Sequence, residues 1–179
     1  ELARLSPKKS VLIHGSGVDL SLYSRKSICM DTPVVLLASR LLVSKGVREF
    51  VRAAELIKTH GFNARFILVG EPDLMSTETI HQQELDLWEQ QGIVELWGYR
   101  NDMNVVLSSA NIVVLPSYYG EGLPKVLIEA AACGRAVITT DHPGCRDAIK
   151  DGVTGLLVPV RNVEALVTTI SSLLNDLVR

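Results

Sequence analysis

The stretch SYYGEGLPKVLIEAAACG, residues 117–134, contains two carboxylates, Glu121 and Glu129. A helical path from Glu121 to Glu129 would separate them by about 12 Å of rise, whereas the paired carboxylates of glycoside hydrolysis lie about 5 to 9.5 Å apart. Pro124 suits the first turn of a helix, because its missing N–H is not needed there. Glu121 therefore falls in a loop and Glu129 on the second helical turn, and we interpret them as two contact points on one extended ligand.

The start of the following helix offers a binding site for an anion. The first N–H groups, those of Gly122, Leu123 and Lys125, and the positive end of the helix dipole suit a phosphate. Glu129 is set among apolar residues and is costly to bury without donors, and ribose hydroxyls are suitable donors. Spacing alone leaves the alternative open that Glu129 pairs with a structural cation and that Glu121 lies on a surface loop.

Three cations follow predicted strands. Arg40 and Lys45 lie on one loop and can together hold a diphosphate, the arginine by its fork and the lysine as a point charge. Arg100 follows another strand, where backbone groups of Gly98 and Tyr99 can meet the edge of a base. Arginines and lysines after strands are often only solvated, and that alternative stands for each of these cations taken alone.

The elements that must position these groups are β-branched strands alternating with amphipathic helices, an order typical of parallel βαβ units. We expect a three-layer, Rossmann-like α/β fold with a doubly wound parallel sheet, in which ligands bind outside the carboxyl ends of the strands. The expected strands are 11–15, 33–39, 64–70, 94–98, 111–117 and 136–140, and 154–159 would make a seventh. The expected helices are 47–60, 77–91, 101–110, one that begins near Pro124, and 162–177, capped by Asn162.

Composition limits the function classes. A chain of 179 residues with 47% hydrophobic residues can bury one core, so we expect a single domain over 1–179. The net charge of −2 gives no basic field, which argues against a nucleic-acid partner. Neither the three cysteines nor the four histidines have the spacing of metal ligands. Cys133 is expected in the core, and a cytoplasmic location is expected for the protein.

These segments resemble the C-terminal, nucleotide-binding half of the GT-B glycosyltransferases, in the retaining group called family 4 or group 1. The resemblance is carried by HGSGVDL (14–20), ASRLLVSKGVREFVRAA (38–54), ILVGEPD (67–73), VELWGYRNDM (94–103), SYYGEGLPKVLIEAAACGRAVITTD (117–141) and DGVTGLLVPVRN (151–162). Glu121 to Glu129 matches the family's E-x7-E motif, and Arg40 with Lys45-Gly46 matches its phosphate loop. HGSGVD departs from the Asn-Gly-Val-Asp that the family has more often.

The resemblance implies a role for each candidate residue. Arg40 and Lys45 would hold the donor diphosphate, Glu129 the ribose, and Glu121, the candidate catalytic group, the hydroxyls of the transferred sugar. Residues 98–100 would meet the base, and the loop amides after Glu121 the sugar or phosphate. The donor is expected to be a nucleoside diphosphate sugar, most often of UDP. No cofactor or bound metal is expected, because cationic side chains and a helix N-terminus neutralise the leaving diphosphate.

The resemblance also implies a second domain, Rossmann-like and N-terminal to Glu1, that holds the acceptor. We therefore expect this chain to fold, to bind a nucleotide sugar weakly, and to transfer no sugar alone. The expected acceptor is a glycan or lipid-linked molecule of cell-surface polysaccharide or lipopolysaccharide assembly, and peripheral membrane association of the whole protein is left open. The alternatives are a non-catalytic nucleotide- or phosphosugar-binding module and a GT-B sugar-nucleotide epimerase. A phosphorylase would require a lysine placed for pyridoxal phosphate, and the sequence shows no such context.

Overall fold

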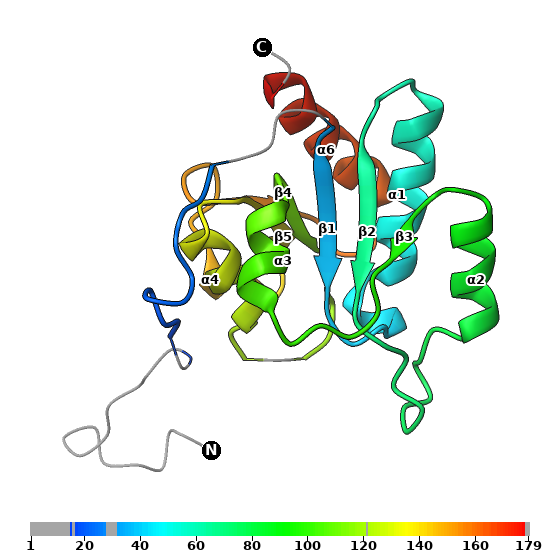
Figure 1. Ribbon diagram of the computed structural model, residues 1–179, viewed down its shortest axis with the longest axis horizontal. Coiled ribbons are helices and arrows are strands. Elements are labelled where there is room, and N and C mark those ends of the chain that lie inside the picture. Colours follow the sequence, from blue (N-terminus) through cyan, green and yellow to red (C-terminus); the bar gives the residue numbers. More distant parts are fainter. Residues whose placement is uncertain (1–14, 16, 28–31, 121, 178–179) are drawn as a thin grey trace.

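The computed structural model describes residues 15, 17–27, 32–120 and 122–177. Within them the strands form one parallel sheet in the order β3-β2-β1-β4-β5-β6, flanked by helices on both faces (Figure 1). The strands are β1 (Val34–Ala38), β2 (Arg65–Val69), β3 (Glu95–Leu96), β4 (Ile112–Leu115), β5 (Ala136–Thr140) and β6 (Leu156–Val158). The α/β prediction is confirmed, and 154–159 supplies β6. Residues 11–14 of the first predicted strand lie outside the described part of the chain.

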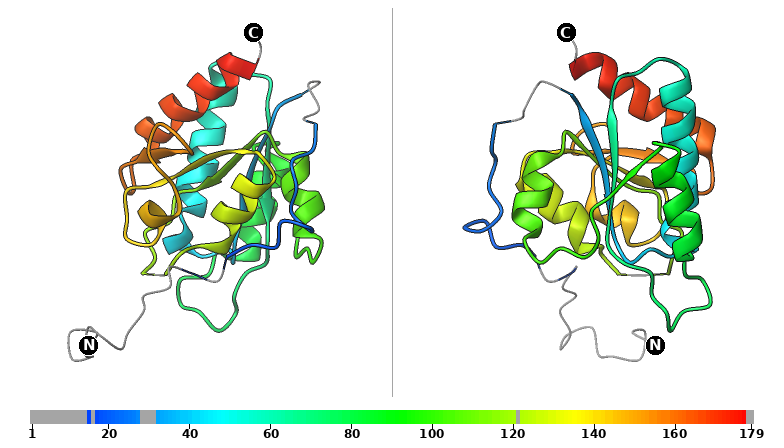
Figure 2. Two further views of the ribbon diagram at one scale, coloured as in Figure 1. Left: turned by 90° about the vertical axis from the view of Figure 1, so that its left-hand side faces the viewer. Right: turned by 45° about the vertical axis from the view of Figure 1, so that its right-hand side comes forward.

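Continuous apolar strands place the core on both faces of the sheet. All five residues of β1 are buried, as expected when helices cover both sides of a parallel sheet. Successive side chains of a strand point to opposite faces, so Val35 and Leu37 join the cluster beneath α1 and α6, whereas Leu36 joins the cluster beneath α3 and α4. Figure 2 shows these two helical layers on either side of the sheet.

Four of the five predicted helices form within two residues of their predicted bounds, and a further helix, Cys145–Ala148, was not predicted. They are α1 (Val47–Thr59), α2 (Gln82–Gln90), α3 (Met103–Ser109), α4 (Lys125–Ala132), α5 (Cys145–Ala148) and α6 (Val163–Leu177), with a 3₁₀ turn, η2 (Val43–Lys45), before α1. The predicted cap of the last helix is confirmed, since the N–H of Ala165 donates to Oδ1 of Asn162 over 2.9 Å. Cys133 is buried in the core, as predicted.

The second predicted helix was placed wrongly at its start, because α2 begins later, at Gln82. Thr79 pairs with Leu42 in an antiparallel bridge, and the N–H of Ile80 donates to the carbonyl of Leu41 over 2.9 Å. These backbone bonds hold the residues before α2 in an extended path and bury Ile80 completely. Ile80, which falls within the predicted helix 77–91, therefore belongs to a loop that is hydrogen-bonded to the turn after β1.

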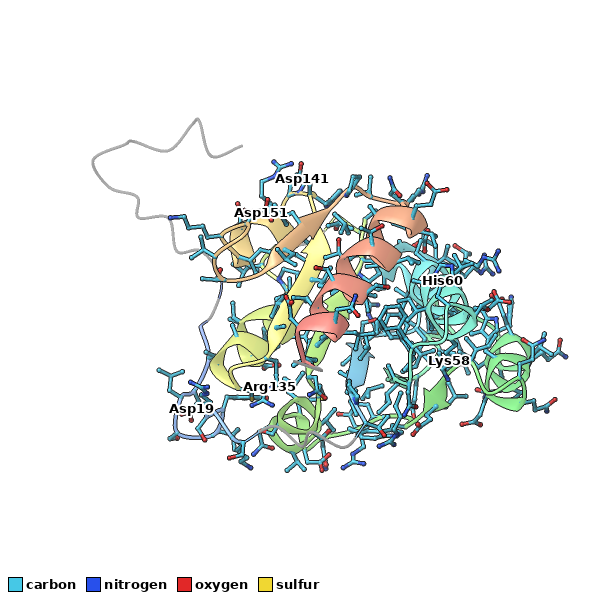
Figure 3. The ribbon with its side chains drawn as sticks, turned by 90° about the horizontal axis from the view of Figure 1, so that it is seen from above. Asp19, Lys58, His60, Arg135, Asp141 and Asp151 are labelled. Carbon is cyan, nitrogen blue, oxygen red and sulfur yellow. The ribbon has the colours of Figure 1, made fainter. Side chains whose placement is uncertain are left out.

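A segment at the N-terminal side, residues 17–27, runs beside α3 and α4 (Figure 1). The buried guanidinium of Arg135 donates to the carbonyls of Cys133 (2.8 Å) and Ala110 (3.1 Å) and to that of Lys26. Figure 3 shows Arg135 on the same side of the domain as Asp19, which belongs to this segment. The segment is thus attached to the helical layer that carries α4.

Candidate functional site

A cavity of about 570 Å³ opens at the carboxyl ends of β1 and β2, between the loop after β3 and the start of α4. The strand arrowheads point down in Figure 1, so the cavity lies at the lower end of the sheet in that view. The connections from β1 run toward β2, and those from β4 run toward β5. This reversal between β1 and β4 is the topological switch point at which α/β sheets bind ligands.

Five of the residues predicted for the site line this cavity together. They are Arg40, Tyr99, Arg100, Lys125 and Glu129. Their elements are far apart in sequence, and the sheet order brings them to one edge, as predicted from the strand ends. Apolar side chains, including Val69 and Met103, share the lining. The cavity can therefore accept a flat ring as well as charged and hydroxyl groups.

The other predicted residues lie around the cavity. Lys45 ends the turn η2 and is buried, and within the described chain it does not form part of the lining. Gly98 contributes its carbonyl, which accepts the N–H of Gly70 over 2.8 Å. Gly122 and Leu123 precede α4 and are exposed and half-buried, respectively. Glu121 lies outside the described residues, so its predicted catalytic role stays a prediction.

Two glycines let the loops of the site pack closely. Gly70 has φ 132°, and a Cβ added there would lie 1.9 Å from the carbonyl oxygen of Ser39. Gly46 has φ 76°, and its added Cβ would lie 2.3 Å from the carbonyl oxygen of Pro116. Only glycine adopts such backbone conformations without strain. The loop after β2 therefore touches the end of β1, and the turn after β1 touches the loop after β4.

Arg40 is held at the mouth of the cavity by a residue that the sequence did not indicate. Its Nη1 lies 2.8 Å from Oδ2 of Asp73, and its side chain is 55% exposed. The other oxygen of Asp73 accepts the N–H of Met75 over 3.1 Å, so the same carboxylate shapes the loop after β2. The hydrogen bond with Asp73, followed by that with Tyr119, raises the pKa of Arg40. The guanidinium is charged, oriented and still accessible to a ligand.

Glu129 has a second unforeseen neighbour, the phenol of Tyr23 in the N-terminal segment. Burial, followed by the charge of Glu129 and a hydrogen bond to it, raises the pKa of Tyr23. The phenol therefore keeps its proton at neutral pH and donates to the carboxylate. Because a carboxylate can accept several hydrogen bonds, Glu129 can still accept from hydroxyl groups in the cavity that it lines.

Arg100 is paired within its own loop. Its Nε donates to Oδ1 of Asp102 over 2.7 Å, and Nη2 bonds the other carboxylate oxygen. This hydrogen bonding raises the pKa of Arg100. The guanidinium also lies 5.9 Å from the ring centroid of Trp97. Arg100 thus contributes an oriented cation to the end of the cavity that Tyr99 also lines.

No group of three or more histidine, cysteine, aspartate or glutamate residues in the described ranges could hold a metal ion. None of the helices there has both the length and the apolar character needed to span a membrane.

The strand order and the cavity at the switch point define a Rossmann-like α/β domain of the type found in GT-B glycosyltransferases. A family model described as "Glycosyl transferases group 1" matches residues 32–176. Because this match covers most of the chain, the chain belongs to that family of glycosyltransferases.

The curated relatives are also named as glycosyltransferases. One relative is the N,N'-diacetylbacillosaminyl-diphospho-undecaprenol alpha-1,3-N-acetylgalactosaminyltransferase of Campylobacter jejuni. The chain is 37% identical to it over 148 residues, and this alignment covers 80% of this chain and 36% of that protein. The chain is 28% identical over 171 residues to the putative colanic acid biosynthesis glycosyltransferase WcaL of Escherichia coli, covering 89% and 41%. The chain spans less than half the length of these relatives.

Solved structures share the fold. Sucrose-phosphate synthase from Thermosynechococcus elongatus superimposes with a TM-score of 0.80 at 27% identity, covering 99% of this chain and 47% of that one. HepE from Anabaena, solved in complex with UDP, superimposes with a TM-score of 0.76 at 23% identity, covering 89% and 46%. At this identity the likeness to HepE concerns the fold alone.

Proposed function

We propose that this chain is the donor-binding domain of a retaining glycosyltransferase that takes a sugar from a nucleoside diphosphate, UDP in the first instance. The observation that carries the proposal is the placing of Arg40 and Glu129 on one cavity at the switch point. A cation and a carboxylate across one cavity suit a ligand with an anionic part and a hydroxyl-bearing part. A nucleoside diphosphate has both.

The donor would lie across the carboxyl edge of the sheet. Arg40, Lys45 and the first N–H groups of α4 would neutralise the diphosphate, first as a bound group and then as the leaving group. Glu129 would accept from the ribose hydroxyls. The base would occupy the end lined by Tyr99 and Arg100. In this arrangement side chains and a helix N-terminus provide the positive charge, and no metal is required.

The acceptor is proposed to be a glycan or a lipid-linked sugar of polysaccharide assembly. The names of the relatives support this class, because the Campylobacter jejuni enzyme acts on a diphospho-undecaprenol-linked sugar and WcaL is named for colanic acid. Those proteins are more than twice as long as the part that matches this chain. We assign the acceptor site to a region of the whole protein that this chain does not contain.

Binding calorimetry tests the donor site. The 179-residue chain is expected to bind UDP, and Arg40→Ala is expected to weaken that binding about 10-fold or more, the effect of losing a charge-assisted hydrogen bond. The matched control is Arg52→Ala, which removes an exposed cation of α1 paired with Glu55 and should leave UDP affinity unchanged. Titrations with GDP, ADP and free phosphosugars identify the base.

Two outcomes would contradict the proposal. One is that none of the three nucleoside diphosphates binds. The other is that UDP affinity is equal in the wild type and in Arg40→Ala, because the assigned cavity would then not hold the diphosphate. Binding of a phosphosugar in preference to every nucleotide would instead favour a sensor of phosphosugars.

A further inference from the structure

Tyr119, in the loop after β4, lies against both cations that follow β1. Its ring centroid is 4.8 Å from Nζ of Lys45 and 6.0 Å from Cζ of Arg40. Both distances fall in the range in which an aromatic face attracts a cation, about 6 Å. One aromatic side chain therefore contacts two positive groups that come from a different loop of the site.

Hydrogen bonds between the two loops hold the backbone that carries Tyr119. The N–H of Tyr118 donates to the carbonyl of Ser44 over 2.9 Å, and Oγ of Ser117 donates to the same carbonyl over 3.3 Å. The N–H of Tyr119 then donates to Oγ of Ser117 over 3.2 Å. Since Ser44 directly precedes Lys45, these bonds join the loop that carries the ring to the turn that carries the ammonium.

We propose that Tyr119 is a positioning residue for the donor diphosphate, whose ring keeps Arg40 and Lys45 together so that both charges act on the same pair of phosphates. This inference rests on the proposed function. Two cations repel each other, and long side chains lose rotamer freedom when a ligand orders them. The aromatic face offsets the repulsion and orders both side chains before the donor arrives, which lowers the cost of binding.

The test compares two substitutions with two nucleotides. Tyr119→Leu removes the aromatic face and is expected to raise the Kd for UDP about 5- to 15-fold. Tyr119→Phe keeps the aromatic face and loses only the hydroxyl that hydrogen-bonds Arg40, so its Kd for UDP should rise less than that of Tyr119→Leu. UMP presents one phosphate fewer to the two cations, so its affinity should fall less in Tyr119→Leu, and the preference for UDP over UMP should shrink.

The neighbouring tyrosine provides a matched control. The Tyr118 ring lies 4.3 Å from Cζ of a different arginine, Arg161, and it belongs to the same loop. Tyr118→Leu is expected to change the Kd for UDP by less than about 2-fold, because Arg161, the cation over which its ring lies, is not a predicted diphosphate ligand. A loss in Tyr118→Leu equal to that in Tyr119→Leu would overturn the inference and leave only a general effect of the loop.

A double-mutant cycle separates positioning from a structural effect. If the ring acts through Arg40 and Lys45, then Tyr119→Leu should cost less UDP affinity in a chain that already carries Arg40→Ala. An equal loss in both backgrounds, or an equal loss of UDP and UMP binding, overturns the inference. If the wild-type chain binds UDP and Tyr119→Leu binds it equally well, the inference fails and the proposed function stands. If the wild type binds no nucleoside diphosphate, the proposed function itself fails.

Discussion

Gly70→Ala is expected to lower the free energy of unfolding by about 3 kcal/mol or more and to abolish UDP binding. The alanine Cβ would overlap the carbonyl oxygen of Ser39, 1.9 Å away, at a φ of 132° that side chains rarely adopt. Strained backbone costs about 1–3 kcal/mol and overpacking a similar amount. Relief would require the loop to move and break its bond to Gly98, which would deform the cavity. Urea unfolding and calorimetry with UDP measure the two effects.

The matched control for this prediction is Gly120→Ala. An added Cβ at Gly120 meets no described atom within 4 Å, and its φ is not in the strained range, so stability should change by less than about 0.5 kcal/mol. The account would be contradicted if Gly70→Ala and Gly120→Ala unfolded at the same urea concentration with the same slope. The close approach of the loops after β1 and β2 would then not be required.

Glu129→Ala is expected to raise the Kd for UDP by at least about 30-fold, because two hydrogen bonds from ribose hydroxyls to a charged acceptor would be lost. The wild type should also prefer UDP to 2′-deoxy-UDP, and Glu129→Ala should lose most of that preference. Calorimetry with the two nucleotides measures both. Glu129→Gln keeps the size of the side chain, removes the charge, and should fall between the wild type and the alanine variant.

Glu121→Ala is expected to affect UDP affinity differently from Glu129→Ala. It should leave UDP affinity nearly intact in this chain and damage sugar transfer in the whole protein, because the proposed partner of Glu121 is the transferred sugar and UDP lacks that sugar. Equal losses of UDP affinity in Glu121→Ala and Glu129→Ala would show that the two carboxylates do not divide their roles as proposed.

The fold was predictable because its strongest signals are local. Strands buried on both faces read as continuous apolar runs, and the helices carry caps such as Asn162. The start of α2 was not predictable from periodicity, because Ile80 is apolar at helical spacing and is buried by backbone pairing with the turn after β1. That pairing joins segments distant in sequence, and a single window of residues does not contain it.

The site residues that could be predicted from the sequence are those in the loops that follow strands. Arg40 and Arg100 lie in the loops after strands β1 and β3, and the order of the sheet then places them on one cavity. Asp73, Tyr23 and Tyr119 were missed, because each acts on a residue supplied by another loop or helix. Asp73 follows β2 after Gly-Glu-Pro, and its place beyond a strand end was the one signal that could have found it.

Amide chemical-shift mapping of the 179-residue chain during a UDP titration tests the central claim most directly. The claim is that the cavity at the switch point holds a nucleoside diphosphate. Saturable shifts are expected at the carboxyl edge of the sheet, at Gly70, Tyr99, Arg100 and Lys125. Shifts confined to the opposite edge, around the smaller cavity of about 300 Å³ lined by Gly134 and Gly155, or no saturable shift at all, would contradict it.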